Sequence, residues 1–491
     1  MLLLGIDLGT SSIKVSIVDV ATQQCIASAH YPETEAEIIS LNAGWAEQSP
    51  DGWWEYTQKA ILKAHQSNKY NPQDIVAIGI AYQMHGLVCV DKNQNVLRNS
   101  IIWCDSRAVP FGEKAFRAIG EKESLTHLLN SPGNFTASKL AWVKENEPAL
   151  FEKIDKIMLP GDFIAMKLTG EITTTISSLS EGIFWDFKKE EVSSDIMKVF
   201  GFDKKLIPEI KDVFTAHGGV KKEVAQQLSL NEGIPVTYKA GDQPNNALSL
   251  NVLQPGEVAA TAGTSGVVYG VTDKVNYDPL SRVNSFAHVN YTKQEKRIGV
   301  LLCINGTGIL NSWLRKNFFN GLSYDQINSE AAKIDIGSDG LLLYPFGNGA
   351  ERVLQNKDIG AAMQGLQFNR HHRGHVARAS QEGIVFSLNY GMDVMKQMGM
   401  ELKTVRAGHA NMFLSDVFTA SFANTTGCVV ELYNTDGSIG AARAAGVGAK
   451  VYNSFAESFK GMELIKKVEP KSELRHRYAE LYDKWKSGMT V

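Results

Sequence analysis

The sequence predicts an α/β protein built from two related halves. Apolar strand-like runs alternate with helical segments along the 491 residues, as in sheets covered by helices. Residues 2–20 and 258–273 also resemble each other, because each has an apolar run, a Gly-Thr-Ser turn and a second run rich in valine or isoleucine. Such a similarity near the start of each half favours a duplicated architecture of two facing domains, although so short a motif leaves a chance match open.

The composition excludes several classes of protein. Hydrophobic residues make up 44% of the chain and charged residues 21%, which is typical of a soluble globular enzyme. The net charge is −3, so no basic surface is expected for nucleic acid or for an anionic membrane. Asp7 interrupts the apolar start of the chain, and no apolar run of about 18 residues follows. The sequence therefore predicts neither a secretory signal nor a membrane span.

The cysteines point to a reducing compartment. Their number is odd, they lie far apart and they form no C-x-x-C pair. We therefore expect free thiols in a cytoplasmic enzyme, without a disulfide framework or a zinc site. The sequence leaves a homodimer open as the assembly.

The first half predicts a sheet with helices between its strands. Ser49 suits a helix N-cap and Pro50 suits the first helical position. The continuous apolar run at 75–81 is typical of a buried strand. Near 235–241 another strand ends at Asp242, and a helix of small residues follows. Further expected elements are helices near 53–66 and 138–145, strands at 87–90 and 101–103, and a charged, irregular insertion at 186–223.

The second half repeats this alternation. We place the domain boundary after residue 250, which gives domains 1–250 and 251–491. The last helix of the second domain is charged and amphipathic. The expected elements are strands at 258–271, 299–304 and 403–407, and helices from Gly308, over 377–398, after His409 and from about 470.

The turn after the first strand is suited to phosphate. Asp7 ends an apolar strand, where a carboxylate is costly unless it binds something. Gly9 allows a ligand to approach the backbone, and the amides and hydroxyls of Thr10 and Ser11 suit phosphate oxygens. An aspartate beside such a turn can hold Mg²⁺ through water. The structural alternative is a tight hairpin with a capping aspartate.

Asp242 is the candidate general base. It follows a strand and precedes a helix, which is where open α/β sheets place their ligands. A carboxylate there can accept the proton of an attacking hydroxyl during phosphoryl transfer. The structural alternative is a helix N-cap. Gly263-Thr264-Ser265 is a weak signal alone, but with the first turn it would form a second phosphate clamp.

Polar and aromatic residues gather at the predicted ends of strands, which suits a sugar. Gly408 to Asn411 form a turn that opens a helix and offers N–H groups to a nucleotide, although an ordinary loop would look the same. His371, His372 and His375 lack a further ligand at metal-binding spacing, so a solvated loop is expected there. The strand-end cluster contains Trp45, Glu47, Gln48, Gln83, Met84, His85, Trp103, Asp105 and Arg107.

Taken together, these segments resemble the FGGY family of carbohydrate kinases from the first hairpin to about Gly448. The resemblance implies the duplicated ribonuclease-H-like fold of the actin and hexokinase type of ATPase, with a cleft between two domains. It also implies a sugar kinase that uses ATP and Mg²⁺. The blocks that carry it are GIDLGTSSIK, GWAEQSPDGWW, QMHG, WCDSR, SKLAW, LPGDFIAMKLTGE, AGDQPNNA, AGTSG, ARASQEGI and DGSIGAARAAG.

The resemblance assigns a role to each matching residue. Asp242 corresponds to the catalytic base and Asp7 to the aspartate near the metal. The implied sugar-side residues are Gln83, Met84, His85, Trp103, Asp105 and Arg107. The implied ATP-side residues are Gly9, Thr10, Ser11, Lys14, Gly263, Thr264, Ser265, Gly306, Thr307, Gly408 and Asn411.

Within the family, Met84-His85 resembles the pair found in enzymes that phosphorylate D-xylulose to D-xylulose 5-phosphate, which is the expected reaction. Cys104, Thr175 and the loop after Asp242 depart from the family pattern and leave the sugar open. Gluconate, ribulose and glycerol are the alternative substrates. An alternative of another class is a nucleotide-gated binding module without sugar transfer. His409 interrupts an expected run of glycines and bears on nucleotide affinity.

Overall fold

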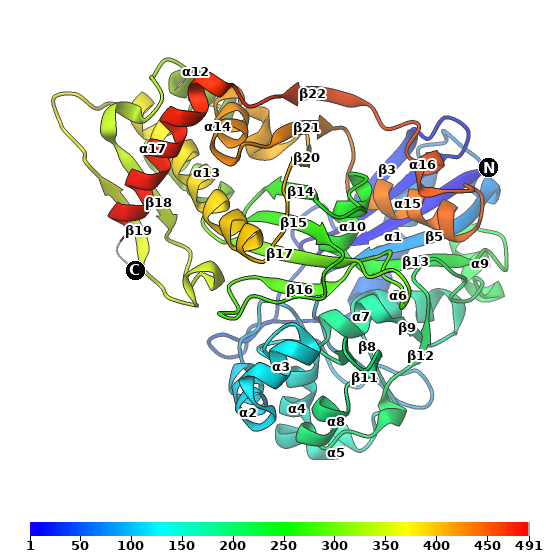
Figure 1. The fold of residues 1–491 in the computed structure, drawn as a ribbon. Helices are drawn as coiled ribbons and strands as arrows, with labels where there is room; N and C mark the ends of the chain where they lie inside the picture. The colour runs from blue at the N-terminus through cyan, green and yellow to red at the C-terminus, as the bar shows by residue number, and fades with distance from the viewer. Residues whose placement is uncertain (490–491) are drawn as a thin grey trace. The chain divides into compact units, whose positions relative to one another are not determined.

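The computed structural model describes residues 1–489, which form two compact units (Figure 1). The first unit contains residues 1–251, 286–298 and 435–462. The second contains residues 252–285, 299–434 and the chain from 463 onward. The first unit therefore includes two segments that a single boundary after residue 250 assigns to the second half.

A mixed sheet forms the centre of the first unit, with the strand order β13-β5-β1-β2-β3 among the described residues. The predicted hairpin over residues 2–20 is confirmed, because β1 pairs antiparallel with β2. β5 runs parallel to both β1 and β13, so the carboxyl ends of these three strands lie at one edge of the sheet. The strands are β1 (Leu2–Leu8), β2 (Ile13–Asp19), β3 (Cys25–Tyr31), β5 (Ile75–Tyr82) and β13 (Val236–Gly241).

Helices cover both faces of this sheet. Alternate residues of β1 from Leu2 to Leu8 belong to the core that also contains residues of α1 (Pro50–His65) and α6 (Pro160–Thr169). Leu3 faces the other way and packs with alanines of α15 (Gly437–Gly448). Ser49 caps α1 through a hydrogen bond from the Gly52 N–H, as the sequence predicted.

Two glycines allow α15 to lie close to the sheet. A Cβ atom on Gly5 would lie 1.8 Å from the Ser438 carbonyl oxygen, and one on Gly79 would lie 2.0 Å from the Ala441 carbonyl oxygen. Real Cβ atoms do not approach backbone atoms so closely, so the helix would have to move away from any larger residue. The two glycines thus determine where the N-terminus of α15 lies.

The insertion at 186–223 is more ordered than predicted. It contains a short helix, α8 (Ser194–Phe200), which Ser193 caps and which buries Ile196 and Met197. So short a helix has too few turns to show a clear hydrophobic period in a charged segment. The other elements of the first unit are β4 (Glu47–Gln48), β6 (Val88–Val90), β7 (Ser100–Ile101), β8 (Lys156–Met158), β9 (Thr173–Thr175), β10 (Trp185–Asp186), β11 (Glu191–Val192), β12 (Glu209–Lys211), α2 (Val109–Ile119), α3 (Glu121–Leu128), α4 (Thr136–Asn146), α5 (Pro148–Phe151), α7 (Ile176–Glu181), α9 (Lys222–Leu228), α10 (Asp242–Ser249), α16 (Phe455–Ser458) and the 3-10 turns Pro72–Asp74 and Lys204–Leu206.

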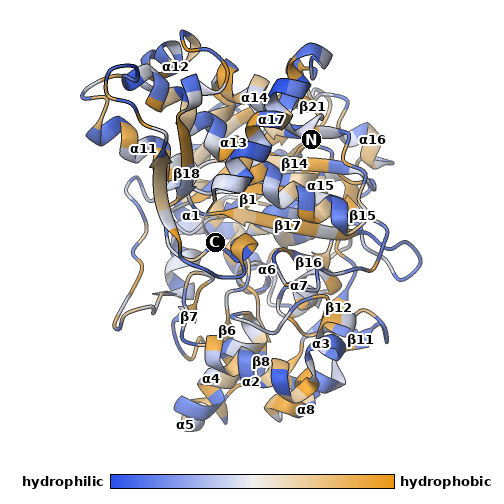
Figure 2. Ribbon diagram, turned by 60° about the vertical axis from the view of Figure 1, so that its left-hand side comes forward, coloured by the Kyte–Doolittle hydropathy of each residue, from blue (hydrophilic) through white to orange (hydrophobic). Residues whose placement is uncertain are grey.

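The second unit is built on a sheet with the order β16-β17-β15-β14-β20-β21-β22 among the described residues. β14 pairs antiparallel with β15, which confirms the predicted second hairpin, and β14 lies parallel to β20. Hydrophobic residues dominate β15 and β17, whereas α12 is largely hydrophilic (Figure 2). The strands are β14 (Glu257–Ala262), β15 (Gly266–Thr272), β16 (Asn284–Ala287), β17 (Ile298–Ile304), β18 (Leu342–Phe346), β19 (Gly360–Gln364), β20 (Thr404–Gly408), β21 (Val429–Tyr433) and β22 (Leu464–Val468).

The helices of the second unit differ from the prediction at two places. The sequence analysis did not predict α12 (Tyr324–Ala332). A helix was expected directly after His409, but a 3-10 turn, η5 (Asn411–Leu414), comes first, and Ser415 then caps α14. Within residues 1–489, none of the helices has the length and apolar character needed to cross a membrane. The helices are α11 (Gly308–Asn317), α12 (Tyr324–Ala332), α13 (Arg373–Gln397), α14 (Asp416–Thr426) and α17 (Ser472–Gly488), with further 3-10 turns at Ser338–Gly340 and Arg352–Leu354.

The packing of α15 makes Gly79→Ala a destabilising substitution. The new methyl group would overlap the Ala441 carbonyl, which belongs to a helix backbone and cannot rotate aside. We expect a loss of about 3 kcal/mol, at the upper end for overpacking, measured by urea unfolding. Gly52→Ala is the matched control, because its methyl group would lie at an ordinary 3.4 Å from the Ser49 Cβ. Equal stability of the two variants would contradict the role of Gly79.

Candidate active site

The carboxyl edge of the first sheet brings three predicted residues together. Strand register aligns Gly241 with Tyr82, and Tyr82 with Leu8. Asp242 begins α10 directly after β13, and Gln83 follows β5. Asp7 lies one residue before the end of β1. Neighbouring parallel strands thus place the two carboxylates and the amide at the same level of the sheet.

The two carboxylates destabilise each other's ionised form. Burial and then the charge of Asp7 raise the pKa of Asp242 from 3.8 to about 7. Burial and then the charge of Asp436 raise the pKa of Asp7 to about 6. Hard oxygen ligands with unbalanced negative charge are the ligands that Mg²⁺ prefers, so this pair fits a magnesium site.

Asp436 is a residue of this site that the sequence analysis missed. Its Oδ1 caps α15 by accepting the Ile439 N–H at 3.0 Å, and its Oδ2 pairs with the Lys14 Nζ at 2.6 Å. Burial raises the pKa of Asp436, but Lys14 and the hydrogen bonds outweigh burial and leave the pKa below its ordinary value. The pattern Asp-Gly-Ser before a helix of small residues is an N-cap signal that could have revealed this residue.

Asp7 lies against the N-terminus of α15. A Cβ on Gly437 would be 2.3 Å from an Asp7 carboxylate oxygen, so only glycine permits this approach. The partial positive charge at a helix N-terminus stabilises a carboxylate placed there. The helix therefore positions Asp7 and, through Asp436, the ammonium group of Lys14.

The first turn connects the predicted phosphate side with the predicted sugar side. The Gly9 N–H donates to the backbone oxygens of Asp7 and Ser12, both at 3.1 Å, which closes the turn. The Thr10 hydroxyl donates to the Gln83 Oε1 at 3.1 Å and accepts the Trp103 indole N–H at 2.9 Å. Ser11 is exposed beside them. Thr10 thus joins the first turn to Gln83 and to Trp103.

The sugar-side residues divide into accessible and buried groups. Trp103 is 52% exposed and presents an aromatic face, whereas Met84 is buried against Gly241. The His85 ring packs edge-on against Phe135, with the ring centroids 4.8 Å apart. These positions agree with the predicted cluster at the strand ends.

Asp105 and Arg107 lie within a buried ion-pair network. Asp105 Oδ2 accepts from Arg107 Nε at 2.8 Å and Nη2 at 2.7 Å, and from the Ala46 N–H at 2.6 Å. Arg107 Nη1 donates to Glu47 at 2.6 Å, and its guanidinium lies 3.7 Å from the Trp45 ring centroid. Their hydrogen-bonding groups are thus largely engaged inside the protein. The two residues support the loop that carries Trp103.

Two further buried residues near this loop, Glu181 and Lys139, also escaped the sequence analysis. Glu181 ends α7 and Lys139 lies in α4. Lys139 lies in the SKLAW block, which marked the segment without giving the lysine a role, whereas nothing in a single sequence distinguishes Glu181 from the many exposed carboxylates of the chain. Thr175, which replaces an aspartate expected from the resemblance, caps α7 by accepting the Ser178 N–H at 3.0 Å.

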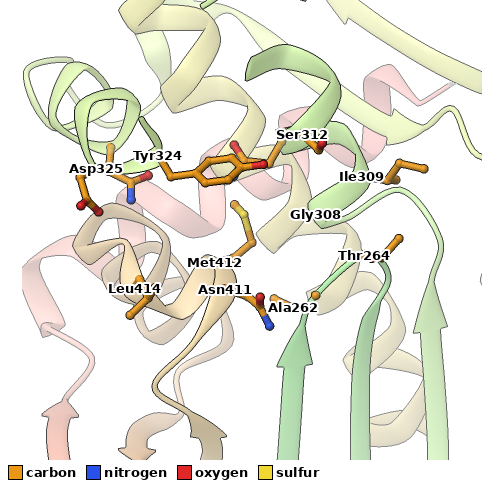
Figure 3. Close-up of a pocket in the computed structure, with 13 residues that line it drawn as sticks. Ala262, Thr264, Gly308, Ile309, Ser312, Tyr324, Asp325, Asn411, Met412 and Leu414 are labelled. Carbon is orange, nitrogen blue, oxygen red and sulfur yellow. The ribbon is translucent and has the colours of Figure 1, made fainter. Parts of the chain in front are cut away.

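The second unit contains a pocket of about 460 Å³ at the turn of its own hairpin (Figure 3). The turn is joined to α11, because the Gly308 N–H donates to the Gly263 oxygen at 2.8 Å and the Ile309 N–H donates to the Thr264 oxygen at 3.0 Å. Figure 3 shows the Tyr324 ring reaching across the pocket on the side opposite Asn411. The lining residues are Ala262, Gly263, Thr264, Gly308, Ile309, Asn311, Ser312, Tyr324, Asp325, Asn328, Asn411, Met412 and Leu414.

The pocket includes only some of the predicted ATP-side residues. Gly263, Thr264 and Asn411 line it. Gly306 and Thr307 are buried in the loop before α11, where the Thr307 hydroxyl donates to the Ile304 oxygen at 3.1 Å. The remaining predicted residues of this unit, Ser265 and Gly408, lie at the ends of the turn and of β20.

The histidine cluster has a structural explanation. His372 is the N-cap of α13, and its Nδ1 accepts the Gly374 N–H at 3.2 Å. A different group with metal-ligand spacing, formed by His127, Asp186 and Asp195, has its ligand atoms within 4.8 Å of one another. The Lys189 Nζ lies 3.7 Å from Asp186 and 3.6 Å from Asp195, and so neutralises part of their charge.

Comparison with known proteins assigns both halves of the chain to one family. Residues 2–249 match the profile of the FGGY family of carbohydrate kinases, N-terminal domain, and residues 258–449 match the C-terminal domain of the same family. The xylulose kinase of Bacillus subtilis (strain 168) is 30% identical over 501 aligned positions, covering 99% of this chain and 96% of the relative. The xylulose kinase of Escherichia coli (strain K12) is 28% identical, covering 92% and 91%.

Solved structures of several sugar kinases share the fold. A ligand-bound xylulose kinase from Lactobacillus acidophilus has a TM-score of 0.90 at 20% identity, covering 99% of this chain and 97% of that chain. A gluconate kinase from the same organism gives 0.89 at 20% identity, with the same coverage. Plasmodium falciparum glycerol kinase with ADP gives 0.88 at 22% identity, covering 100% and 99%.

These matches confirm the predicted fold, a two-domain α/β fold of the actin-like ATPase type. The chain belongs to the FGGY family of carbohydrate kinases and is an ATP-dependent phosphotransferase.

Proposed function

We propose that this kinase transfers the γ-phosphoryl group of ATP to the terminal hydroxyl of D-xylulose and forms D-xylulose 5-phosphate and ADP. The observation that carries the proposal is the position of Asp242 at the head of α10, beside Asp7 and one strand away from Gln83. The sugar is inferred from curated relatives that are xylulose kinases at 26–30% identity. The fold alone does not select it, since gluconate and glycerol kinases share the fold.

Asp242 acts as the general base in this proposal. A carboxylate with a pKa of about 7 is ionised in an appreciable fraction of molecules at neutral pH and holds a proton more strongly than an ordinary aspartate. It accepts the proton of the attacking hydroxyl as the sugar oxygen bonds to the γ-phosphorus and the bond to the ADP oxygen breaks. The proton thus moves from the sugar to the Asp242 carboxylate, and the electron pair of the broken bond leaves with ADP.

The other residues bind and orient the reactants. Asp7 would hold Mg²⁺ through water, and the ion supplies positive charge against the developing charge on the phosphoryl oxygens. Lys14 and the turn amides around Thr10 would bind phosphate oxygens. On the sugar side, Trp103 offers a face to the carbon chain. Gln83 is buried and its amide is bonded to Thr10 and Gln48, so it acts indirectly, as do Asp105 and Arg107, which hold the Trp103 loop.

The nucleotide base is proposed to enter the pocket of the second unit. The first N–H groups of α11 are bonded to the turn and to Thr307, so the polar lining comes from side chains such as those of Asn311, Ser312 and Asn411, which suit ribose and phosphate oxygens. Tyr324 and Met412 supply the apolar and aromatic surface that a purine ring requires. Thr264 lies on the phosphate side of this pocket.

A sugar panel tests the proposed reaction. ADP release is measured with D-xylulose, D-ribulose, gluconate and glycerol, and NMR locates the phosphate in the product. D-Xylulose should give a kcat/KM at least tenfold above the other three substrates. A higher kcat/KM for one of the other three compounds would identify that compound as the substrate in place of D-xylulose. ATP turnover that no compound stimulates would favour a binding module.

Asp242→Ala should reduce kcat by roughly two orders of magnitude or more, the range expected for a positioned base. Binding of ATP, measured by calorimetry, should change less than threefold. Asp74→Ala, which removes an exposed carboxylate at the opposite end of β5 from the site, is the matched control and should leave kcat unchanged. Near-normal turnover in Asp242→Ala would refute the proposed base.

Asp242→Asn should stabilise the protein at high pH. Because the folded-state pKa of about 7 exceeds the ordinary 3.8, the folded state binds more protons, so stability falls as pH rises from about 4 to about 7. The variant removes this loss, worth up to about 4 kcal/mol above pH 7. Thermal unfolding without ATP or Mg²⁺ should therefore show a higher Tm for the variant at pH 8 and a smaller difference at pH 5. A gain confined to pH 5 would reverse the sign and exclude this explanation.

A further inference from the structure

His85 has a left-handed backbone conformation at the sugar side of the site. Its φ is +63°, a region in which the Cβ of an ordinary residue is crowded by its own carbonyl oxygen. Residues other than glycine adopt such a conformation in turns and at helix ends, as at Leu129 and Ser229 of this chain, and also at binding sites, where the surrounding structure holds them. The groups that contact the His85 backbone are therefore candidates for a role in the site.

Two buried ionisable side chains hold the peptide groups on both sides of His85. The Glu181 Oε2 accepts the His85 N–H at 3.1 Å, and the Lys139 Nζ donates to the His85 carbonyl oxygen at 2.7 Å. The Glu181 side chain is 2% exposed and Lys139 is fully buried. We call these two contacts the His85 clamp.

The direction of the imidazole ring is fixed as well. Its Nδ1 lies 3.0 Å from the Glu181 carbonyl oxygen. The ring packs against Phe135 and Phe286, with centroid distances of 4.8 Å and 5.4 Å. Glu181 thus contacts His85 through its carboxylate and through its own backbone.

Burial disfavours the charged form of both side chains. It raises the pKa of Glu181 well above its ordinary value and lowers the pKa of Lys139 to about 7. Burying a charged side chain costs stability, and each of these two is hydrogen-bonded to the backbone of His85. A contribution to stability therefore does not explain why Glu181 and Lys139 are buried here. Their placement on either side of His85 explains it better.

The clamp is also connected to the proposed base. The Glu181 Oε1 accepts the Tyr82 hydroxyl at 2.6 Å, at the end of β5. A Cβ on Gly241 would lie 3.2 Å from the same oxygen and 2.6 Å from the Met84 Cγ. Glu181 and the His85 turn therefore pack against the residue that precedes Asp242. A shift of the clamp would move the sugar-side turn relative to the carboxylate.

We propose that Glu181 and Lys139 are positioning residues that hold His85 in its left-handed conformation and thereby determine how the sugar is selected and oriented. Neither side chain contacts the sugar in this proposal. The inference rests on the proposed function and adds to it that the turn at 83–86 faces the sugar.

The test compares variants that break the clamp with one that preserves it. Glu181→Leu and Lys139→Met remove a contact and should each raise the KM for the sugar at least tenfold, with the KM for ATP within twofold of wild type. Glu181→Gln can still accept the His85 N–H while its amide donates to Tyr82, so it should stay within about threefold. Tyr82→Phe removes a Glu181 contact outside the clamp and serves as the matched control.

His85→Gly supplies a second test, because glycine adopts a positive φ without strain. In the His85→Gly background, Lys139→Met should raise the KM for the sugar by less than twofold, since no strained side chain is left to hold. An equal effect of Lys139→Met in both backgrounds would overturn the proposal. Equal increases in the two KM values, accompanied by a lower Tm, would instead assign these residues a purely structural role and would also overturn it.

A spectroscopic measurement separates this inference from the proposed function. The ¹⁵N imidazole signal of His85, assigned by its loss in His85→Gln, is recorded without sugar or ATP. It should shift in Lys139→Met and in Glu181→Leu, and should keep its position in Tyr82→Phe. The clamp alone would be refuted if the wild-type enzyme phosphorylates its sugar while both clamp variants keep the wild-type His85 signal and the wild-type sugar KM. Failure of every sugar in the panel would refute the proposed function, while the signal would still report on the clamp.

Discussion

The close approach of α15 to the first sheet is the constraint on which the site of the first unit depends. Gly5 and Gly79 remove the side chains that would hold the helix away. The helix N-terminus can then lie against Asp7, and its capping residue Asp436 can pair with Lys14. Two glycines inside strands would ordinarily weaken a sheet, so their presence is explained by the backbone contact that they permit.

The same site is unfavourable for folding. Asp7 and Asp242 are recessed at one sheet edge, and each has a pKa raised by burial and by a neighbouring negative charge. The helix dipole and Lys14 relieve part of this repulsion. The repulsion that is left keeps the carboxylate pKa values high enough for a proton to be held near neutral pH. Burial of these charges therefore weakens the unliganded fold and also suits the site to proton transfer.

Much of the fold was predictable because it depends on local patterns. The apolar run at 75–81 and the helix cap at Ser49 depend on neighbouring residues alone, as does the junction at Asp242. Glu181 and Lys139 could not be predicted, because their burial depends on elements distant in sequence. The short helix α8 and the turn before α14 were misread because a segment of one turn or two has too little periodicity to detect.

The WCDSR segment shows that a motif alone does not tell which of its residues contact a ligand and which only hold the loop in place. Trp103 is half exposed, whereas Asp105 and Arg107 engage their polar atoms with each other, with Glu47 and with a backbone amide. A buried group whose hydrogen bonds are already made has little left to offer a ligand, and breaking those bonds would leave an unpaired charge inside the protein. The two kinds of residue thus differ in what they expose: the indole N–H is bonded to Thr10 but the ring face is accessible, whereas the ion pair is buried and fixes the loop that carries the ring. The same reasoning places Glu181 and Lys139 behind His85, since each already satisfies a backbone group of the turn.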